Sequence, residues 1–146
     1  MKVSGRGLTE ITRSEGVRLC AYPDPGTGGA PWTIGYGHTK GVVKGQTITM
    51  YQAISFLQED LTWVEKCIED NVTVKLNQNQ FDALVSFIFN IGCGAFHKST
   101  LLKLLNEGKY ALAQKEFAKW NKAGGRVMGG LVARRKRESE LFGAVA

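Results

Sequence analysis

The chain has 146 residues, of which 43% are hydrophobic and 22% are charged. These are ordinary values for a soluble globular protein of one domain, and no apolar run approaches the roughly 20 residues of a membrane-spanning helix. The 19 basic and 13 acidic residues give a formal net charge of +6, which favours an anionic partner such as nucleic acid, an anionic membrane or bacterial cell wall.

The first predicted element is a helix over residues 6–15. Leu8, Ile11 and Glu15 are spaced so that they fall on one helical stripe. Gly16 follows at once and is the residue type that ends a helix in the left-handed conformation. The helix is therefore expected to end on a glutamate.

A small antiparallel sheet is predicted over residues 17–48. The apolar period changes from helical spacing to two after Gly16, which places Arg18, Cys20 and Tyr22 on the same strand face. The segments expected within the sheet are a strand over residues 17–22, a turn rich in glycine and proline over 23–31, a returning strand over 32–38 and a third short strand at Val42–Val43.

The remainder is predicted to be helical, so the fold class is α+β. Thr49 with Gln52 and Asn77 with Gln80 have the spacing of capping boxes. The first box begins a long amphipathic helix over 50–70, and the second begins the most apolar helix, expected at the centre of the C-terminal core. The segments expected after it are a loop over 89–99, a helix ending at Gly108, a helix from Tyr110 to Trp120, a flexible break over 124–130 and a basic helix over 131–142.

The cysteines Cys20, Cys67 and Cys93 are far apart and have no CxxC spacing. An odd, widely spaced set argues against both a disulfide framework and a zinc site. We therefore expect three reduced thiols that fill half-buried positions.

Glu15 and Asp24 are the first candidates for chemistry. Glu15 lies at the edge of an apolar stripe and at the negative end of a helix dipole, and both conditions favour the protonated carboxyl that a general acid needs. Asp24 lies in a polar turn and is expected to ionise normally. Two carboxyls in such different environments are typical of glycosidic cleavage. The alternative, that Glu15 is a solvent-facing helix residue and Asp24 a turn former, stays open on spacing alone.

EGVRLCAYPD (residues 15–24) followed by TIGYGHT (33–39) resembles the phage-type lysozymes, the muramidase family of tailed-phage endolysins. The likeness covers nearly the whole chain. Further segments that carry it are QEDL (58–61), LNQNQFDALVSFIFNIG (76–92), AFHKSTLL (95–102) and LVARRKRESELF (131–142).

The resemblance implies a single lysozyme-like domain made of two lobes with a cleft between them. The sheet lobe is expected over about residues 12–58, and the helical lobe over 1–11 together with 72–146. The helix over 50–70 is expected to connect them.

The resemblance also implies an activity: cleavage of the β-1,4 bond between N-acetylmuramic acid and N-acetylglucosamine in peptidoglycan. Glu15 is expected to be the proton donor, Asp24 the second catalytic carboxylate, and Thr33 a residue that helps to hold the attacking water. Inversion at the anomeric carbon is expected from the family, with carboxyls roughly 6.5–9.5 Å apart to leave room for a water.

Other residues receive expected roles from the same resemblance. His38 is expected to form a structural ion pair with Asp60 between the sheet and the long helix. Phe89, Asn90 and Ser99 are expected on the cleft wall, although a helix C-cap for Asn90 and an N-cap for Ser99 remain equally open. The resemblance gives no role to His97, which we expect to be a loop residue.

The run Arg134-Arg135-Lys136-Arg137 allows three interpretations. It is a nucleic-acid-binding face, a solvated basic helix face, or a segment from which Arg134 or Arg137 folds back to acidic residues near Glu15 and holds that site in place. The family resemblance favours the last.

The leading hypothesis is therefore an endolysin that needs no metal or cofactor and acts as a monomer on peptidoglycan. The alternatives are a lytic transglycosylase on the same bond and a basic nucleic-acid-binding module. The N-terminal residues lack the apolar stretch of a signal peptide, so we expect synthesis in the host cytoplasm and access to periplasmic peptidoglycan after a holin permeabilises the membrane. No nucleic-acid or membrane partner is expected.

Overall fold

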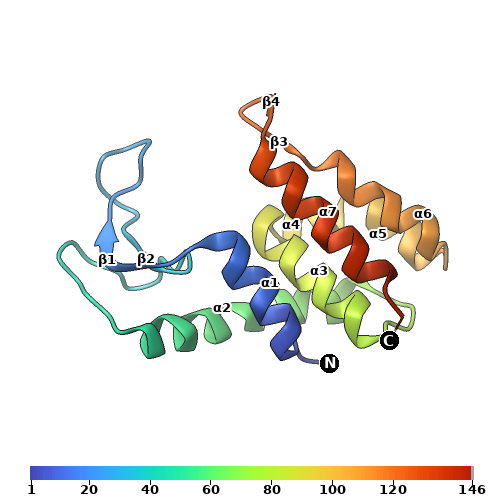
Figure 1. Cartoon of the computed structure of the whole chain (residues 1–146), viewed down its shortest axis with the longest axis horizontal. Coiled ribbons are helices and arrows are strands. Elements are labelled where there is room, and N and C mark those ends of the chain that lie inside the picture. The colour runs from blue at the N-terminus through green and yellow to red at the C-terminus, as the bar shows by residue number, and fades with distance from the viewer. Residues whose placement is uncertain (146) are drawn as a thin grey trace. The chain divides into compact units, whose positions relative to one another are not determined.

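The computed structural model describes residues 1–145, and its element order is followed most easily in Figure 1. The helices are α1 (Gly5–Glu15), α2 (Met50–Asn71), α3 (Gln78–Ile91), α4 (Cys93–His97), α5 (Thr100–Asn106), α6 (Tyr110–Glu116) and α7 (Gly129–Gly143), with a 3₁₀ turn, η1, at Phe117–Lys119. The strands are β1 (Arg18–Tyr22), β2 (Thr33–Gly35), β3 (Lys122–Ala123) and β4 (Arg126–Val127). The predicted α+β class, mainly helical, is confirmed.

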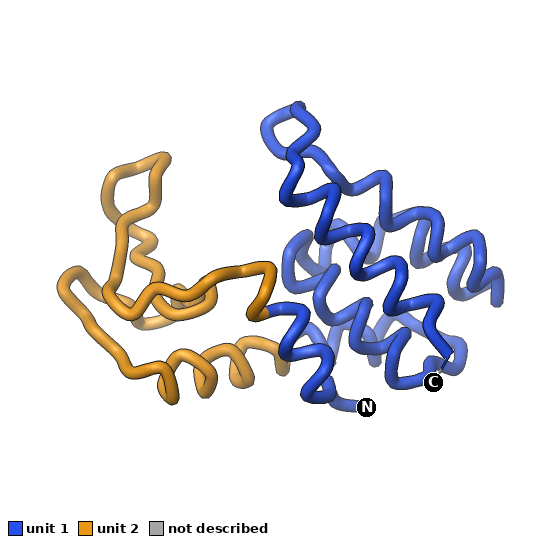
Figure 2. Tube along the Cα trace, in the orientation of Figure 1, with its two compact units in different colours: residues 1–11, 63–146 blue, residues 12–62 orange. Residues whose placement is uncertain are grey.

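The chain divides into two compact units, which Figure 2 shows in different colours. Unit 1 comprises residues 1–11 and 63–146, and unit 2 comprises residues 12–62. Both α1 and α2 therefore contribute residues to each unit. Unit 2 contains the small sheet, and unit 1 contains the other helices and the β3–β4 hairpin.

The sheet of unit 2 is an antiparallel pair with an irregularity inside β1. Arg18 lies opposite Gly35, and Tyr22 lies opposite Thr33. The returning strand is shorter than the predicted 32–38, because β2 ends at Gly35, which has a φ of 66°. The chain then turns so that His38 forms a bridge with Ile34.

The predicted third strand at Val42–Val43 is wrong. The segment is a turn in which Gln46 N donates to Val43 O at 3.2 Å, and Gly41 and Gly45 on either side have positive φ values of 72° and 84°. The second edge of β1 is instead bridged by Thr47, opposite Cys20. Positive φ values interrupt the extended backbone that a strand requires.

Helix α3 forms the centre of unit 1, as predicted. Its residues 81–88 are all buried, and it packs along α7. The Asn77–Gln80 capping box is complete at its start, and the Thr49–Gln52 box likewise starts α2 with Gln52 N donating to Thr49 Oγ1 at 3.1 Å. These local signals account for the accuracy of the predicted helix starts.

Two segments of unit 1 contain more regular structure than the sequence indicates. The predicted loop over 89–99 contains the end of α3 and the whole of α4, a five-residue helix that is too short to show a helical period. The predicted flexible break contains the β3–β4 hairpin. Its turn residues Gly124 and Gly125 have φ values of 58° and 78°, and two successive positive φ values suit a tight type I′ turn.

The expectation of three reduced thiols is wrong, because Cys67 and Cys93 form a disulfide. The bond joins α2 to α4 across a sequence separation of 26 residues, with Cα atoms 6.0 Å apart. Cys20 is a free and exposed thiol. Sequence spacing carries no information on which distant helices pack together, so the pair was not detectable from the sequence.

No helix in residues 1–145 has both the length and the apolar character needed to cross a membrane.

Candidate active site

Glu15 is the last residue of α1, as predicted, and its side chain is half-buried. Gly16 follows with a φ of 65°, which ends the helix and turns the chain into β1. One turn earlier on the same helix, Ile11 is fully buried. The burial of the apolar stripe fixes the rotation of α1, and this rotation determines where the carboxyl of Glu15 lies.

Glu15 lines a pocket of about 360 Å³, within the usual size range of small-molecule sites. All the lining residues belong to unit 2: Glu15, Gly16, Val17, Arg18, Tyr22, Gly35 and Gly37. The pocket thus joins the end of α1 to the start of β1 and to the glycine-rich end of β2. It brings together one acidic, one basic and one aromatic side chain.

Asp24 lies in a tight turn after β1. Its backbone N–H donates to Gly29 O at 2.9 Å, and its carbonyl accepts from Gly28 N at 2.8 Å and Thr27 N at 3.2 Å. The carboxylate lies over Gly26, where an added Cβ would come within 3.1 Å of Asp24 Oδ2. Gly26 therefore leaves room for this carboxylate, which is half-buried.

Thr33 begins β2 and faces Tyr22 across the sheet. Neither Thr33 nor Asp24 is among the residues that line the pocket of Glu15, although all three belong to unit 2. Arg18 and Tyr22, which do line it, were not singled out from the sequence. The signal for them was the alternation that placed both on one face of the first strand.

The expected pair of His38 and Asp60 is present. His38 Nδ1 lies 2.8 Å from Asp60 Oδ2 and 3.0 Å from Oδ1. The imidazole is buried and stacks on Phe56 of α2, with ring centroids 4.4 Å apart. The pair joins the end of the sheet region to α2 within unit 2.

The three expected cleft-wall residues belong to unit 1 and have different surroundings. Phe89 stacks on Trp63 with ring centroids 6.4 Å apart. Asn90 lies within α3 and is not its C-cap, which is Gly92; its Oδ1 accepts a hydrogen bond from Arg135 Nη2 at 2.7 Å.

The hydroxyl of Ser99 caps α5, which bears out the second interpretation of this residue. Its Oγ accepts from Leu102 N at 3.1 Å and donates to Phe96 O at 2.7 Å, and the side chain is buried. His97, expected in a loop, is the last residue of α4, and its Nδ1 lies 2.6 Å from Asn71 Oδ1.

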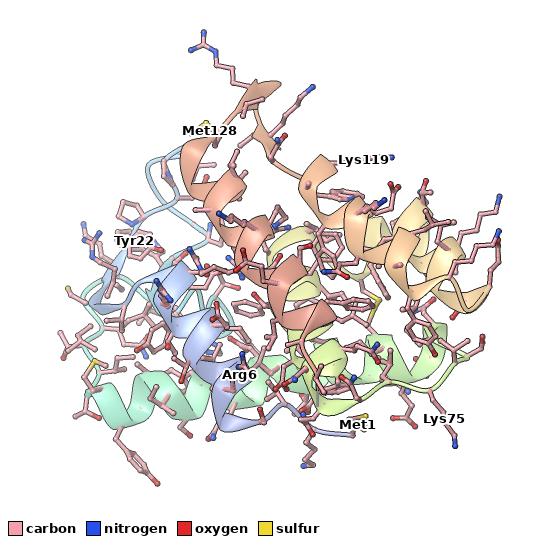
Figure 3. All side chains as sticks on the ribbon, turned by 45° about the vertical axis from the view of Figure 1, so that its right-hand side comes forward. Met1, Arg6, Tyr22, Lys75, Lys119 and Met128 are labelled. Atoms are coloured by element: carbon pink, nitrogen blue, oxygen red, sulfur yellow. A yellow bond between two sulfur atoms is a disulfide. The ribbon has the colours of Figure 1, made fainter. Side chains whose placement is uncertain are left out.

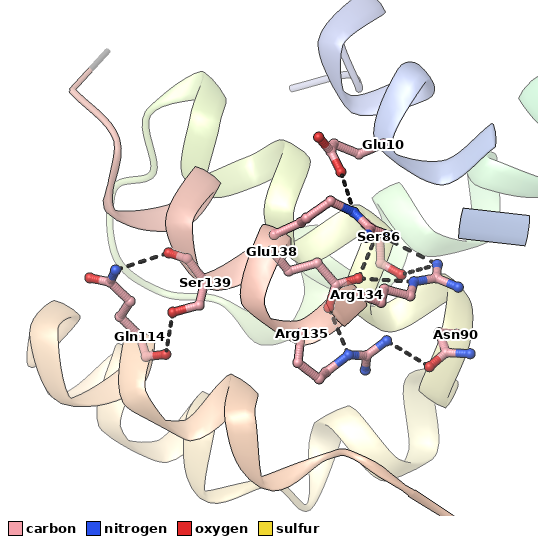
Figure 4. Close-up of polar contacts among 9 residues, drawn as sticks. Glu10, Ser86, Asn90, Gln114, Arg134, Arg135, Glu138 and Ser139 are labelled. Carbon is pink, nitrogen blue, oxygen red and sulfur yellow. Dashed lines mark hydrogen bonds and ion pairs between the residues drawn. The ribbon is translucent and has the colours of Figure 1, made fainter. Parts of the chain in front are cut away.

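Only part of the basic run of α7 is a solvated face: Lys136 is exposed, but the two arginines before it are not (Figure 4). Arg134 and Arg135 are buried, and their Nε atoms lie 3.2 and 2.9 Å from the carboxylate of Glu138. Arg134 Nη2 also donates to Ser86 O at 3.0 Å. This burial removes much of the support for a nucleic-acid-binding face. The buried partners Ser86 and Glu138 had no signal in the sequence.

Arg137 does reach an acidic residue of α1. Its Nε lies 3.4 Å from Glu10 Oε2, five residues before Glu15. The pair joins the last helix to the first within unit 1. Arg137 therefore contacts an acidic residue of the helix that ends at Glu15, and its expected role of holding the Glu15 site in place stays a prediction.

Burial raises the pKa of the Glu138 carboxyl above its ordinary range, while the guanidiniums of Arg135 and Arg134 and the Ser86 hydroxyl oppose that change. The Ser86 hydroxyl donates to Glu138 Oε2 at 2.5 Å. The same carboxyl therefore connects α7 with α3 at the centre of unit 1.

The described part of the chain contains no group of side chains suited to ligate a metal ion. In residues 1–145, no three His, Cys, Asp or Glu side chains are grouped so that they would hold a metal ion. The groups available at the pocket of Glu15 are the carboxyl, the guanidinium of Arg18 and the phenol of Tyr22, which suit proton transfer and the binding of a polar or anionic ligand.

Comparison with known proteins gives a consistent result. The chain is 48% identical over 147 residues to the endolysin of Salmonella phage P22, covering 97% of this chain and 98% of that one. It is 47% identical over 146 residues, with the same two coverages, to the endolysin of Acyrthosiphon pisum secondary endosymbiont phage 1. Among solved structures, it matches the muramidase domain of SpmX from Asticaccaulis excentricus with a TM-score of 0.92 and 37% identity over 99% of both chains.

The profile of the family described as Phage lysozyme matches residues 12–138. The matched region contains the end of α1 with Glu15, the whole sheet of unit 2 and most of α7. Together with the high identity to endolysins over nearly the full chain, this match shows that the chain belongs to the phage lysozyme family.

Proposed function

We propose that this lysozyme-type glycosidase is an endolysin that hydrolyses the β-1,4 bond between N-acetylmuramic acid and N-acetylglucosamine in peptidoglycan. One observation carries the proposal: Glu15 ends α1 inside a pocket in which it is the only acidic lining residue. A carboxyl that lines a pocket of this size can reach the glycosidic oxygen of a bound sugar and donate a proton to it. The endolysins and the muramidase domain that resemble the chain support the same reaction class.

In the proposed reaction, Glu15 transfers its proton to the glycosidic oxygen as the bond from that oxygen to C1 of the muramic acid breaks. A water held with the help of Thr33 attacks C1 and gives its proton to Asp24. The products are a muramic acid with a free reducing end and an N-acetylglucosamine with a free 4-hydroxyl. Proton return through solvent restores Glu15 and Asp24, and an in-line water attack inverts the configuration at C1.

The charge of the chain suits this substrate. Peptidoglycan carries the carboxylates of its peptide stems, and a protein with a net charge of +6 is attracted to it. We further propose synthesis in the host cytoplasm and action on periplasmic peptidoglycan after a holin has permeabilised the membrane. The enzyme is proposed to act as a monomer, without a cofactor.

Mass spectrometry of digested peptidoglycan tests the proposal against a lytic transglycosylase. A hydrolase incorporates one water per cleavage and leaves reducing muramic acid ends, whereas a transglycosylase leaves anhydro-muramyl ends. Reducing muramic acid ends are expected. Anhydro ends would assign the alternative reaction, and products cut at the peptides or at the glucosaminyl side would rule out both. The anomer first released, followed by NMR, tests inversion.

A further inference from the structure

Arg18 is the basic residue of the pocket that contains Glu15, and the reaction proposed above does not use it. The two residues are three positions apart and line the same pocket from the end of α1 and the start of β1. A cation in the same pocket as a proton donor can change which substrates bind beside that donor.

The guanidinium of Arg18 is held by an aromatic ring. Its Cζ lies 4.8 Å from the ring centroid of Tyr22, which lines the same pocket and is labelled in Figure 3. The contact is with this ring, and no salt bridge to Arg18 occurs among residues 1–145. The side chain remains exposed.

This arrangement prepares the guanidinium to bind an anion. The guanidinium lies over the ring of Tyr22 and the side chain is exposed, so its N–H groups are able to form a two-point contact with a carboxylate. Holding the arginine in place before binding also reduces the entropy lost on binding.

We infer that Arg18, held against Tyr22 beside Glu15, binds a carboxylate of the substituent carried by muramic acid and so selects carboxylate-bearing glycan. The inference rests on the proposed function. In peptidoglycan the sugar rings are uncharged, and the carboxylates lie on the lactyl group of each muramic acid or on the peptide attached to it. If Glu15 protonates the oxygen of a muramyl bond, that substituent lies close to the same pocket.

The test compares three substrates: native peptidoglycan, glycan from which an amidase has removed the peptides so that the lactyl carboxylates are free, and native peptidoglycan whose carboxylates have been converted to amides. The wild type is expected to cleave at least one of the two carboxylate-bearing substrates with a kcat/KM about tenfold above that for the amidated material, the size of one charge-assisted contact. Arg18→Gln should abolish this preference through KM. The amidase-treated arm shows whether the lactyl or the peptide carboxylate is bound, because only the former survives there.

Two control variants separate this contact from general charge attraction. Arg13→Gln removes the same charge from an exposed arginine of α1 that does not line the pocket, and it should retain the tenfold preference. Tyr22→Phe keeps the ring and should retain most of the preference, whereas Tyr22→Leu should lose most of it.

A wild-type enzyme that cleaves the amidated material as well as both carboxylate-bearing substrates would overturn the inference, as would an Arg18→Gln variant that keeps the wild-type preference. If the wild type cleaves none of the three substrates at muramyl bonds, the proposed function fails instead. Co-sedimentation of wild type and Arg18→Gln with the three polymers then still decides whether Arg18 recognises the carboxylate.

Discussion

The imidazole of His38 and the carboxylate of Asp60 lie 2.8 Å apart and join two segments of unit 2 that are 22 positions apart in the sequence. The imidazole also stacks on Phe56, one helical turn before Asp60. One buried ring thus holds the chain after β2 on α2. Because β2 supplies part of the pocket of Glu15, the pair supports the site without lining it.

His38→Asn should therefore reduce stability more than rate. Removing the ring loses a buried hydrogen bond and a stacking contact, so we expect the free energy of unfolding to fall by about 1–3 kcal/mol. Urea unfolding checks this, and turnover on peptidoglycan below the unfolding transition should stay within a few-fold of wild type. Asp60→Asn, which leaves the ring stacked, should lose less stability. An unchanged unfolding curve for His38→Asn would remove the structural role of the pair.

The Cys67–Cys93 disulfide should stabilise unit 1 by restricting the unfolded chain. For a separation of 26 residues, the loop-closure entropy corresponds to about 3.5 kcal/mol. The double variant Cys67→Ser/Cys93→Ser should lose stability of this order in urea unfolding, and a reductant should no longer affect it. Cys20→Ser is the matched control, because this thiol is free and exposed. Equal stability of the oxidised wild type and the double variant would show that the disulfide does not stabilise the fold.

Features with a local physical cause were predictable from the sequence. Each of these features depends on contacts within four residues: the capping boxes at Thr49 and Asn77, and the helix end at Gly16. The helices that begin or end at these residues do so where the sequence predicts. The position of Glu15 at the end of α1 followed from the same rules.

Features that depend on distant contacts were not predictable by these rules. Cys93 meets Cys67 because α4 packs near the end of α2, and no spacing rule in the chain shows this. Arg135 is buried because it contacts Glu138 and the ring of Phe87, whereas a run of four basic residues is typical of a solvated surface. Only the family resemblance identified the partner of His38.

Ser99 should act through stability rather than through substrate binding. Its buried hydroxyl already accepts from Leu102 N and donates to Phe96 O. Ser99→Ala should lower the free energy of unfolding by about 1 kcal/mol, as expected for an N-cap, and should leave KM for peptidoglycan near the wild-type value. Ser99→Thr, which keeps a hydroxyl, serves as the control. A raised KM in Ser99→Ala at unchanged stability would restore the cleft-wall role.

The pH dependence of stability should contain a contribution from Glu138. Because burial raises the pKa of this carboxyl above its ordinary value near 4.5, the folded state binds its proton more tightly than the unfolded state does. The stabilisation is therefore fully present below pH 4.5 and is lost as the pH rises through the folded-state pKa. Urea unfolding from pH 4 upwards measures this slope. Glu138→Gln does not titrate and should lack it, whereas an equal slope in both proteins would contradict the assignment.

The most direct test of the whole account is the digestion of purified peptidoglycan by wild type and Glu15→Gln side by side, with products identified by mass spectrometry. Glu59→Gln removes an exposed carboxyl from the same unit and controls for the change of charge. We expect Glu15→Gln to fold normally but to release muropeptides at least about a hundredfold more slowly than the wild type, because the general acid is lost. Glu59→Gln should release them at the wild-type rate. Wild-type release of reducing muropeptides by a folded Glu15→Gln protein would contradict the account.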